Sequence, residues 1–168
     1  VVVQVGTTCV QMALVNYWTA LGVKPAFIIG HSLGDYAALN TAGVLSTSDT
    51  IYLCGRRAQL LTKECKIGTH SMLAIKASLA EVKHFLRDEL HEVSCVNAPA
   101  ETVVSGLVAD IDELAQKCST EGLKSTKLKV PYAFHSSQVD PILEAFEDIA
   151  QGVTFHKPTT PFVSALFG

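Results

Sequence analysis

Charge is scarce in this chain of 168 residues: Asp, Glu, Lys and Arg make up only 17%, and 13 basic against 16 acidic residues leave a net charge of −3. No basic stripe is visible, which argues against a nucleic-acid partner. Disordered proteins have few hydrophobic residues and a high net charge, whereas hydrophobic residues make up 48% of this chain. The composition therefore predicts one globular domain or a part of one. We expect a piece of a longer polypeptide, since residue 1 is Val and the chain stops at Gly168 just after an apolar run.

Two further classes of protein lack support. No basic segment precedes the stretch before the first charged residue, Lys24, and polar residues interrupt it throughout, so we expect a buried helix rather than a membrane span. The odd number of cysteines, five, shows no metal-ligand or C-x-x-C spacing. We therefore expect reduced core cysteines in a cytosolic protein and no metal site. These cysteines are Cys9, Cys54, Cys65, Cys95 and Cys118.

The first part of the chain alternates helix and strand patterns. Apolar residues at helical spacing predict a helix that ends at Gly22. The short apolar run 26–30, a sharp turn at 31–33 and a helical segment at 35–39 predict strand, turn and helix. A second helix is expected behind the cap-rich residues 46–49, reaching about Cys65.

From about residue 70 the pattern changes to β-α-β-β-α-β, the order of a ferredoxin-like subdomain. We expect strands near 72–75, 93–97, 102–108 and 126–130, with helices at 79–90 and 110–118. The predicted fold class is α/β, with a core formed by 1–68 and 132–168 and a ferredoxin-like subdomain at 69–131. In the second core segment, a helix capped by Ser137 and a strand near 161–166 are expected.

The segment Gly30-His31-Ser32-Leu33-Gly34 matches G-x-S-x-G. Between an apolar strand and a helix, this pattern indicates a tight turn that exposes a nucleophilic Ser32 at a helix N-terminus. The following N–H groups can stabilise an oxyanion. The alternative is an ordinary turn serine.

His135 is the leading candidate for the base. It follows the apolar loop 130–134, just before the expected helix, whereas His31 points away from its neighbour Ser32. A core histidine is the alternative role for His135. The remaining histidines lie in polar surroundings and are expected at the surface: His70, His84, His91 and His156.

Arg57 is placed by helical periodicity. At roughly 100° per residue it falls on the apolar face with Leu53 and Leu61, whereas Arg56 falls on the polar flank. A guanidinium that faces a core must be paired. The partner is either Glu64, two turns on, or a ligand carboxylate bound in a bidentate manner.

Three ordered motifs resemble malonyl-CoA:acyl-carrier-protein transacylase domains, above all those of fungal non-reducing iterative polyketide synthases. The motifs are GHSLGDYAAL at 30–39, GRRAQLL at 55–61 and VPYAFHS at 130–136. The resemblance covers essentially the whole chain. It implies a hydrolase-like α/β core with an inserted ferredoxin-like subdomain, in agreement with the element order.

The resemblance also assigns roles. It implies Ser32 as nucleophile, His135 as base, the Leu33 N–H as an oxyanion donor and Arg57 as the partner of the malonyl carboxylate. Phe134 resembles the residue associated with malonyl over methylmalonyl selection. Asn97 and Gln4 resemble positions that line the substrate pocket.

The implied partners are malonyl-CoA as donor, the phosphopantetheine thiol of an acyl carrier protein as acceptor, and a ketosynthase and other domains in the same polypeptide. No cofactor is implied beyond CoA itself. The small basic edge of Lys124, Lys127 and Lys129 could meet an acidic carrier protein, but a solvated strand edge is the favoured interpretation.

The sequence departs from the family at Asp35, where glutamate is usual, and at Val139, where methionine is frequent. The resemblance places the glutamine-bearing oxyanion motif before residue 1 and the carbonyl that orients the histidine beyond Gly168. Two alternatives stay open: a serine hydrolase or thioesterase, which usually has a triad acid between Ser and His, and a catalytically incomplete scaffold.

Overall fold

The computed structural model describes residues 1–167, which divide into two compact units. The core unit contains Val1–Lys63 and Glu144–Gly168, and the inserted unit contains Glu64–Leu143. The inserted unit therefore interrupts the core unit in the sequence. It also includes the loop that carries His135.

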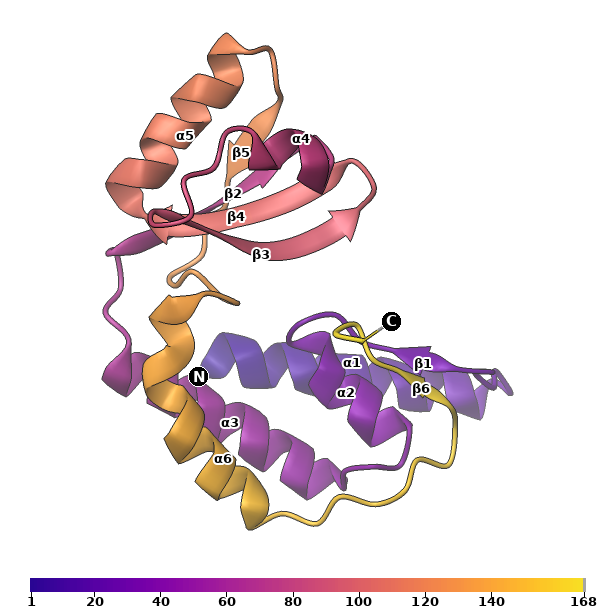
Figure 1. Cartoon of the computed structure of the whole chain (residues 1–168). Coiled ribbons are helices and arrows are strands. Elements are labelled where there is room, and N and C mark those ends of the chain that lie inside the picture. The colour runs from indigo at the N-terminus through magenta and orange to yellow at the C-terminus, as the bar shows by residue number, and fades with distance from the viewer. Residues whose placement is uncertain (168) are drawn as a thin grey trace. The chain divides into compact units, whose positions relative to one another are not determined.

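The core unit consists of helices with a short parallel strand pair beside α2 (Figure 1). Strand β1 pairs with β6, with Ile28 opposite Phe162, and β1 packs on α2 through Ile28 and Ala38. This small apolar cluster fixes the strand that leads into the predicted nucleophile turn. The elements are α1 (Val2–Ala20), β1 (Ile28–Ile29), α2 (Gly34–Thr41), α3 (Thr47–Glu64), α6 (Leu143–Gln151) and β6 (Phe162–Val163).

Helix α3 begins at the predicted cap. The Oγ of Ser46 accepts a hydrogen bond from the backbone N–H of Asp49 at 3.0 Å and donates one to the Asp49 carboxylate at 2.6 Å. The first of these bonds satisfies a backbone N–H that a helix start leaves unpaired.

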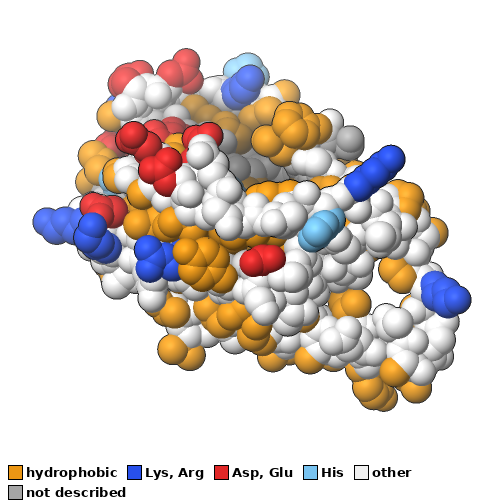
Figure 2. All heavy atoms as spheres, turned by 90° about the horizontal axis from the view of Figure 1, so that it is seen from below, with side chains coloured by type: hydrophobic (Ala, Val, Ile, Leu, Met, Phe, Trp, Pro, Cys, Tyr) orange, Lys and Arg blue, Asp and Glu red, His pale blue; other side chains and the backbone are white. Residues whose placement is uncertain are grey.

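Helix α1 forms where the periodicity predicts it, and Gly22 follows its end with φ of +87°. The expectation that this helix is buried is wrong. Val10, Leu14 and Trp18 are each more than half exposed, and only Thr8 and Met12 are buried. Periodicity detects an apolar stripe but not whether a neighbouring element covers it. Figure 2 shows hydrophobic side chains reaching the surface of the molecule. Within residues 1–167, each helix is too short or too polar to span a lipid bilayer.

The inserted unit is a four-stranded antiparallel sheet with two helices, in the predicted β-α-β-β-α-β order (Figure 1). The strand order across the sheet is β3-β4-β2-β5. Leu73 and Ile75 of the central strand β2 pack with Ile111 and Leu114 of α5 in one buried cluster. The elements are β2 (His70–Ile75), α4 (Leu79–Lys83), β3 (His91–Ala98), β4 (Glu101–Leu107), α5 (Val108–Thr120) and β5 (Ser125–Lys127).

Helix α4 is much shorter than predicted and ends at Lys83 instead of Leu90. The N–H groups of Phe85 and Leu86 donate to carbonyls three residues back, and the N–H of Arg87 then donates to Nδ1 of His91 at 3.0 Å. His91 itself is only 6% exposed, so its expected surface position is also wrong.

The helix that follows the sheet has a different N-cap from the one predicted. Ser136, not Ser137, holds the N-cap position, and Ser137 Oγ instead donates to Glu92 at 2.6 Å. The first turns are a 3-10 helix, η1 (Ser137–Ile142), which continues into α6.

Strand β5 is short and lies at the sheet edge, where Lys127 pairs with Asp112 at 2.6 Å. That ion pair fits the solvated-edge interpretation of the three lysines.

All five cysteines are free thiols, as predicted. Cys54, Cys65 and Cys118 are buried, whereas Cys9 and Cys95 are partly exposed.

Candidate active site

Ser32 sits at the junction of β1 and α2, in a turn with φ of +55°. The N–H of Gly34 donates to the His31 carbonyl at 2.9 Å, and the N–H of Asp35 donates to the Ser32 carbonyl at 3.1 Å. Leu33 occupies the N-cap position of α2. This strand-turn-helix geometry is that of a nucleophile elbow, in which the serine is held at the end of a helix.

The two glycines of the motif serve different purposes. A Cβ at Gly30 would lie 2.6 Å from both the Cα and the backbone nitrogen of Asp35, closer than carbon atoms approach in proteins. Nothing lies within 4 Å of a Cβ built at Gly34. The first glycine is therefore required by close packing inside the turn, and Asp35 is the residue against which it packs.

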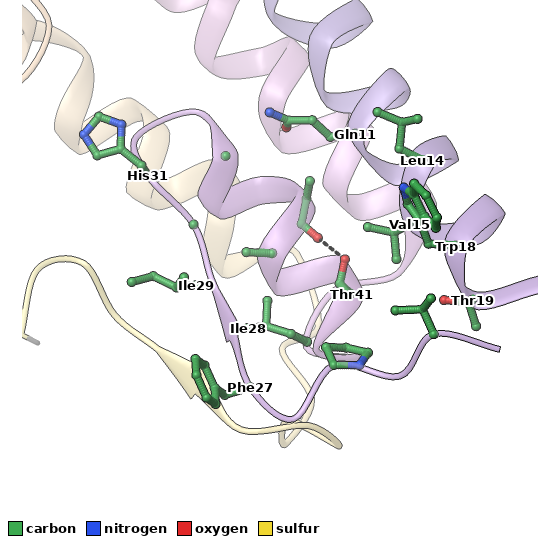
Figure 3. A pocket seen from close by; sticks show the side chains of 16 residues that line it. Gln11, Leu14, Val15, Trp18, Thr19, Phe27, Ile28, Ile29, His31 and Thr41 are labelled. Carbon is green, nitrogen blue, oxygen red and sulfur yellow. Dashed lines mark hydrogen bonds between the residues drawn. The ribbon is translucent and has the colours of Figure 1, made fainter. Parts of the chain in front are cut away.

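One side of the turn borders an apolar groove of about 640 Å³ (Figure 3). Figure 3 shows His31 at one end of the groove and Trp18 and Thr19 toward the other, with Ile28 and Ile29 along its wall. The groove belongs wholly to the core unit. The side chain of His31 lines it, as expected for a residue that diverges from its neighbour in the turn.

His135 lies in a loop that is tightly held within the inserted unit. The Ser136 hydroxyl donates to the Ala133 carbonyl at 2.6 Å, and the Ala133 N–H donates to Oε1 of Gln138 at 2.6 Å. Tyr132 and Ala133 are buried, and His135 is exposed with φ of +60°. The buried part of the loop thus fixes the backbone from which the imidazole projects.

Sequence reasoning missed Gln138, which organises this loop. Its amide nitrogen donates to the Lys66 carbonyl at 2.9 Å and to the Thr69 hydroxyl at 3.1 Å, while its side chain is only 8% exposed. A buried amide with partners on both its nitrogen and its oxygen rigidifies its surroundings. The only sequence signal was a lone glutamine close after the candidate base.

Ser32 and His135 are the only non-glycine residues with positive φ among residues 1–167. Such backbone costs about 1–3 kcal/mol and concentrates at functional sites. Sequence motifs and backbone strain thus single out the same two residues. Ser32 belongs to the core unit and His135 to the inserted unit.

Arg57 is half-buried on α3, and Arg56 is exposed, as the periodicity predicts. Nη1 of Arg57 donates a hydrogen bond to Oε1 of Gln4 on α1 at 2.7 Å. Glu64, the structural partner considered from sequence, is exposed at the end of α3. Burial raises the pKa of Tyr36 to about 12, while the positive charge of Arg57 lowers it in part, so this phenol stays neutral near the guanidinium.

The other predicted residues lie in the inserted unit. Phe134 packs on the cluster of Met72, Val103 and Ala133 and meets Tyr132 edge-on, with ring centroids 5.8 Å apart. Asn97 is exposed near the end of β3, where its amide donates to Glu101 at 3.4 Å. Residues 1–167 contain no group of three or more His, Cys, Asp or Glu placed to hold a metal ion.

Comparison with known proteins agrees with this architecture. The family model described as acyl transferase domain matches residues 1–167. The chain is 96% identical over its whole length to the non-reducing polyketide synthase albA of Aspergillus brasiliensis and 71% identical to the conidial pigment polyketide synthase alb1 of Aspergillus fumigatus. It spans 8% of the length of each of these two proteins.

Solved structures show the same fold. The acyltransferase domain from the second module of the salinomycin polyketide synthase superposes with a TM-score of 0.91 at 35% identity, covering 98% of this chain and 39% of that one. The malonyl CoA-acyl carrier protein transacylase of Coxiella burnetii gives a TM-score of 0.87 at 26% identity, covering 96% of this chain and 53% of that one.

Proposed function

Because the chain belongs to the acyl transferase domains of fungal non-reducing polyketide synthases, we propose that it transfers malonyl groups from malonyl-CoA to an acyl carrier protein. The observation that carries this proposal is the left-handed backbone at both Ser32 and His135, the two residues that the sequence motifs nominate. The transacylase likeness supports the malonyl donor.

In the proposed reaction His135 takes the proton of the Ser32 hydroxyl, and the serine oxygen attacks the thioester carbonyl of malonyl-CoA. The Leu33 N–H stabilises the oxyanion at the start of α2. The C–S bond then breaks, CoA leaves as the thiol after taking the proton from His135, and malonyl-Ser32 remains.

The second half-reaction reverses these roles. His135 accepts the proton of the phosphopantetheine thiol, and the thiol sulfur attacks the ester carbonyl of malonyl-Ser32. The C–O bond to Ser32 then breaks, the serine oxygen takes the proton back from His135, and the malonyl group leaves as a thioester of the carrier. The acceptor is an acyl carrier protein, and a related transacylase has been solved with such a partner. We place the neighbouring ketosynthase, in the same polypeptide, as the consumer of the malonyl unit.

Arg57 anchors the malonyl carboxylate in this scheme. Its half-buried guanidinium provides parallel N–H donors for a carboxylate, which an acetyl group lacks. Phe134 restricts the space for a branched extender, and Asn97 and Gln4 complete the substrate-binding set.

We also propose that the domain has a hydrolase-like α/β core with a ferredoxin-like insertion. Its five free cysteines support a cytosolic enzyme.

The test is incubation of the full-length protein with radiolabelled malonyl-CoA. We expect stable label on Ser32 and none in Ser32→Ala. Rapid release of free malonate would instead support a hydrolase or thioesterase, and the absence of label in the wild type would support a scaffold role.

A substrate comparison tests Arg57. Arg57→Ala should lower kcat/KM for malonyl-CoA roughly ten- to hundredfold, because a charge-assisted pair is lost. Transfer from acetyl-CoA should be spared. Parallel losses on both substrates with a lower melting temperature would contradict the carboxylate role and indicate a structural one.

A further inference from the structure

A glutamate of the inserted sheet holds the chain just beyond His135. Glu92 on β3 accepts two hydrogen bonds from Ser137, one from the backbone N–H at 2.8 Å and one from the hydroxyl at 2.6 Å. The two bonds use different carboxylate oxygens and join residues 45 positions apart in the sequence. Hydrogen bonds to a carboxylate are stronger than those between neutral groups, and a pair of them fixes direction as well as distance. The backbone at Ser137 is therefore tied to the sheet.

The register of β3 explains why Glu92 reaches this loop. Glu92 pairs with Ser105 of β4, and residues opposite each other in an antiparallel pair point to the same face of the sheet. Ser105 shares that face with Val103, which lies two residues away on the same strand. Val103 packs with Ala133, which belongs to the loop that carries His135. A shift of one residue in the pairing would turn Glu92 to the other face.

The local N-cap residue does not cap the helix that follows His135. Ser136 is the N-cap residue of η1, but its hydroxyl donates to the Ala133 carbonyl and makes no capping bond. An N-cap side chain ordinarily accepts a hydrogen bond from the first turn, because those N–H groups lack intrahelical partners. Glu92 accepts the N–H of Ser137, the first residue of η1. A distant strand thus supplies the acceptor that the neighbouring residue does not.

His135 consequently lies between two anchored points of the chain. On one side, the buried Ala133 donates its N–H to Gln138. On the other side, Ser137 is bound to Glu92. A left-handed backbone such as that of His135, with φ of +60°, persists where its surroundings determine it. Holding the chain on both sides restricts where the imidazole starts from, whatever the ring itself contacts.

We propose that Glu92 is a positioning residue for His135: its carboxylate holds the Ser137 backbone and so places the imidazole for proton transfer. This inference rests on the proposed function, in which His135 is the base. Glu92 acts on the loop rather than on the substrate. Displacing a catalytic group by roughly 1 Å can slow a reaction about 100-fold, so a contact that holds the loop can control the chemical step.

Two substitutions of Glu92 in the full-length protein test the geometry. Glu92→Met removes both acceptors and should slow the formation of malonyl-Ser32 roughly tenfold, with little change in KM. Glu92→Gln keeps an acceptor for the Ser137 N–H, and its amide N–H can donate to the hydroxyl oxygen, so it should retain most of the wild-type rate. Rapid-quench measurements with radiolabelled malonyl-CoA give both rates.

A second background shows whether Glu92 acts through His135. In His135→Ala protein the residual acylation proceeds without the base, so adding Glu92→Met should lower it no further. A purely structural role predicts the same fractional loss in both backgrounds, because a defect of the fold does not depend on the imidazole. The double-mutant comparison therefore separates positioning from stability.

Glu81→Met is the matched control in the same unit. Glu81 accepts hydrogen bonds from the N–H and the hydroxyl of Ser78 at the start of α4, the same two kinds of donor. Val82 of that helix packs with Val104, which points to the face of the sheet opposite Val103. Glu81→Met should lower the melting temperature without slowing acylation. Thermal unfolding of each variant checks the fold.

The outcomes separate the positioning role from the proposed function. If Glu92→Met acylates as fast as the wild type, or loses the same fraction in the His135→Ala background, the positioning role is overturned while the proposed function stands. A Glu92→Gln variant as slow as Glu92→Met would overturn it as well, and so would an equal loss in Glu81→Met. If the wild type forms no malonyl-Ser32, or if His135→Ala acylates at the wild-type rate, the proposed function fails and this inference fails with it.

Discussion

At the scale of single residues, backbone conformation marks the site as clearly as side-chain chemistry does. The serine of a G-x-S-x-G turn and a histidine more than a hundred positions later both adopt left-handed φ, of +55° and +60°. For residues with a Cβ this conformation is unfavourable. The conformation persists because hydrogen bonds hold the backbone around each residue. At Ser32 these are the bonds of the turn that begins α2, and near His135 they are the contacts made by Gln138.

The strain at Ser32 can be measured by comparing two inactive variants. Ser32→Gly should be more stable than Ser32→Ala by about 1 kcal/mol, because glycine adopts positive φ without the Cβ penalty. Urea unfolding of the acyl transferase domain measures the difference, and neither variant should form an acyl-enzyme. Equal stabilities would mean that Ser32 carries no conformational strain.

The two motif glycines should respond differently to alanine. Gly30→Ala places a methyl group 2.6 Å from backbone atoms of Asp35 and should destabilise the domain by about 1–3 kcal/mol. Gly34→Ala, the matched control, meets nothing within 4 Å and should keep the wild-type melting temperature. A Gly30→Ala protein as stable as Gly34→Ala would contradict the close packing of this turn.

At the scale of elements, local capping signals place helix starts well and helix ends less well. Ser46 and Ser78 both cap helices, and Ser78 forms a reciprocal box with Glu81. The end of α4 was not predicted: past Lys83, the N–H groups of Phe85 and Leu86 donate to the carbonyls of Val82 and Lys83, three residues back instead of four. A capping box marks the start of this helix in the sequence, but no comparable side-chain signal marks its end.

The capping box gives α4 a pH-dependent contribution to stability. Hydrogen bonds from the Ser78 side chain and backbone lower the pKa of Glu81. A lowered folded-state pKa stabilises the protein above the unfolded pKa, and this stabilisation is lost as pH falls through the folded value. Ser78→Ala should therefore lower the melting temperature by roughly 2–4 °C at pH 7, with a smaller difference near pH 3.

Thermal melts at the two pH values measure this effect. Ser48→Ala, which changes an exposed serine of α3, is the control and should show no difference that varies with pH. A constant gap between Ser78→Ala and wild type at both pH values would rule out the Glu81 contribution.

At the scale of the whole molecule, each unit has its own hydrophobic cluster. Leu73, Val82 and Leu114 belong to the cluster of the inserted unit, whereas Ile28 and Ala42 belong to that of the core unit. Separate clusters allow regions of a chain to differ in local stability.

A cavity in the inserted unit tests this separation. Leu114→Ala should destabilise that unit by roughly 2–5 kcal/mol, because Leu114 is only 2% exposed. Amide hydrogen exchange should accelerate in β2, β4 and α5 while α2 keeps its protection. Leu107→Ala, at a side chain that is 51% exposed, should change exchange little. Equal acceleration in α2 would show that the two units open together.

The sequence by itself determined the features encoded by neighbouring residues. The strand-turn-helix at Ser32, the cap of α3, the order of elements in the inserted sheet and the apolar-face position of Arg57 all follow from turn chemistry and periodicity within a few residues. The three motifs also identified the family. Each of these signals is local, so no knowledge of distant contacts was needed.

Only the tertiary structure decided what meets across long separations. It gave Arg57 a hydrogen bond to Gln4, buried His91 and left one face of α1 exposed. It also showed that Gln138 holds the His135 loop. Burial and partner choice depend on which elements pack together, and periodicity along one helix or strand carries no information about its neighbour.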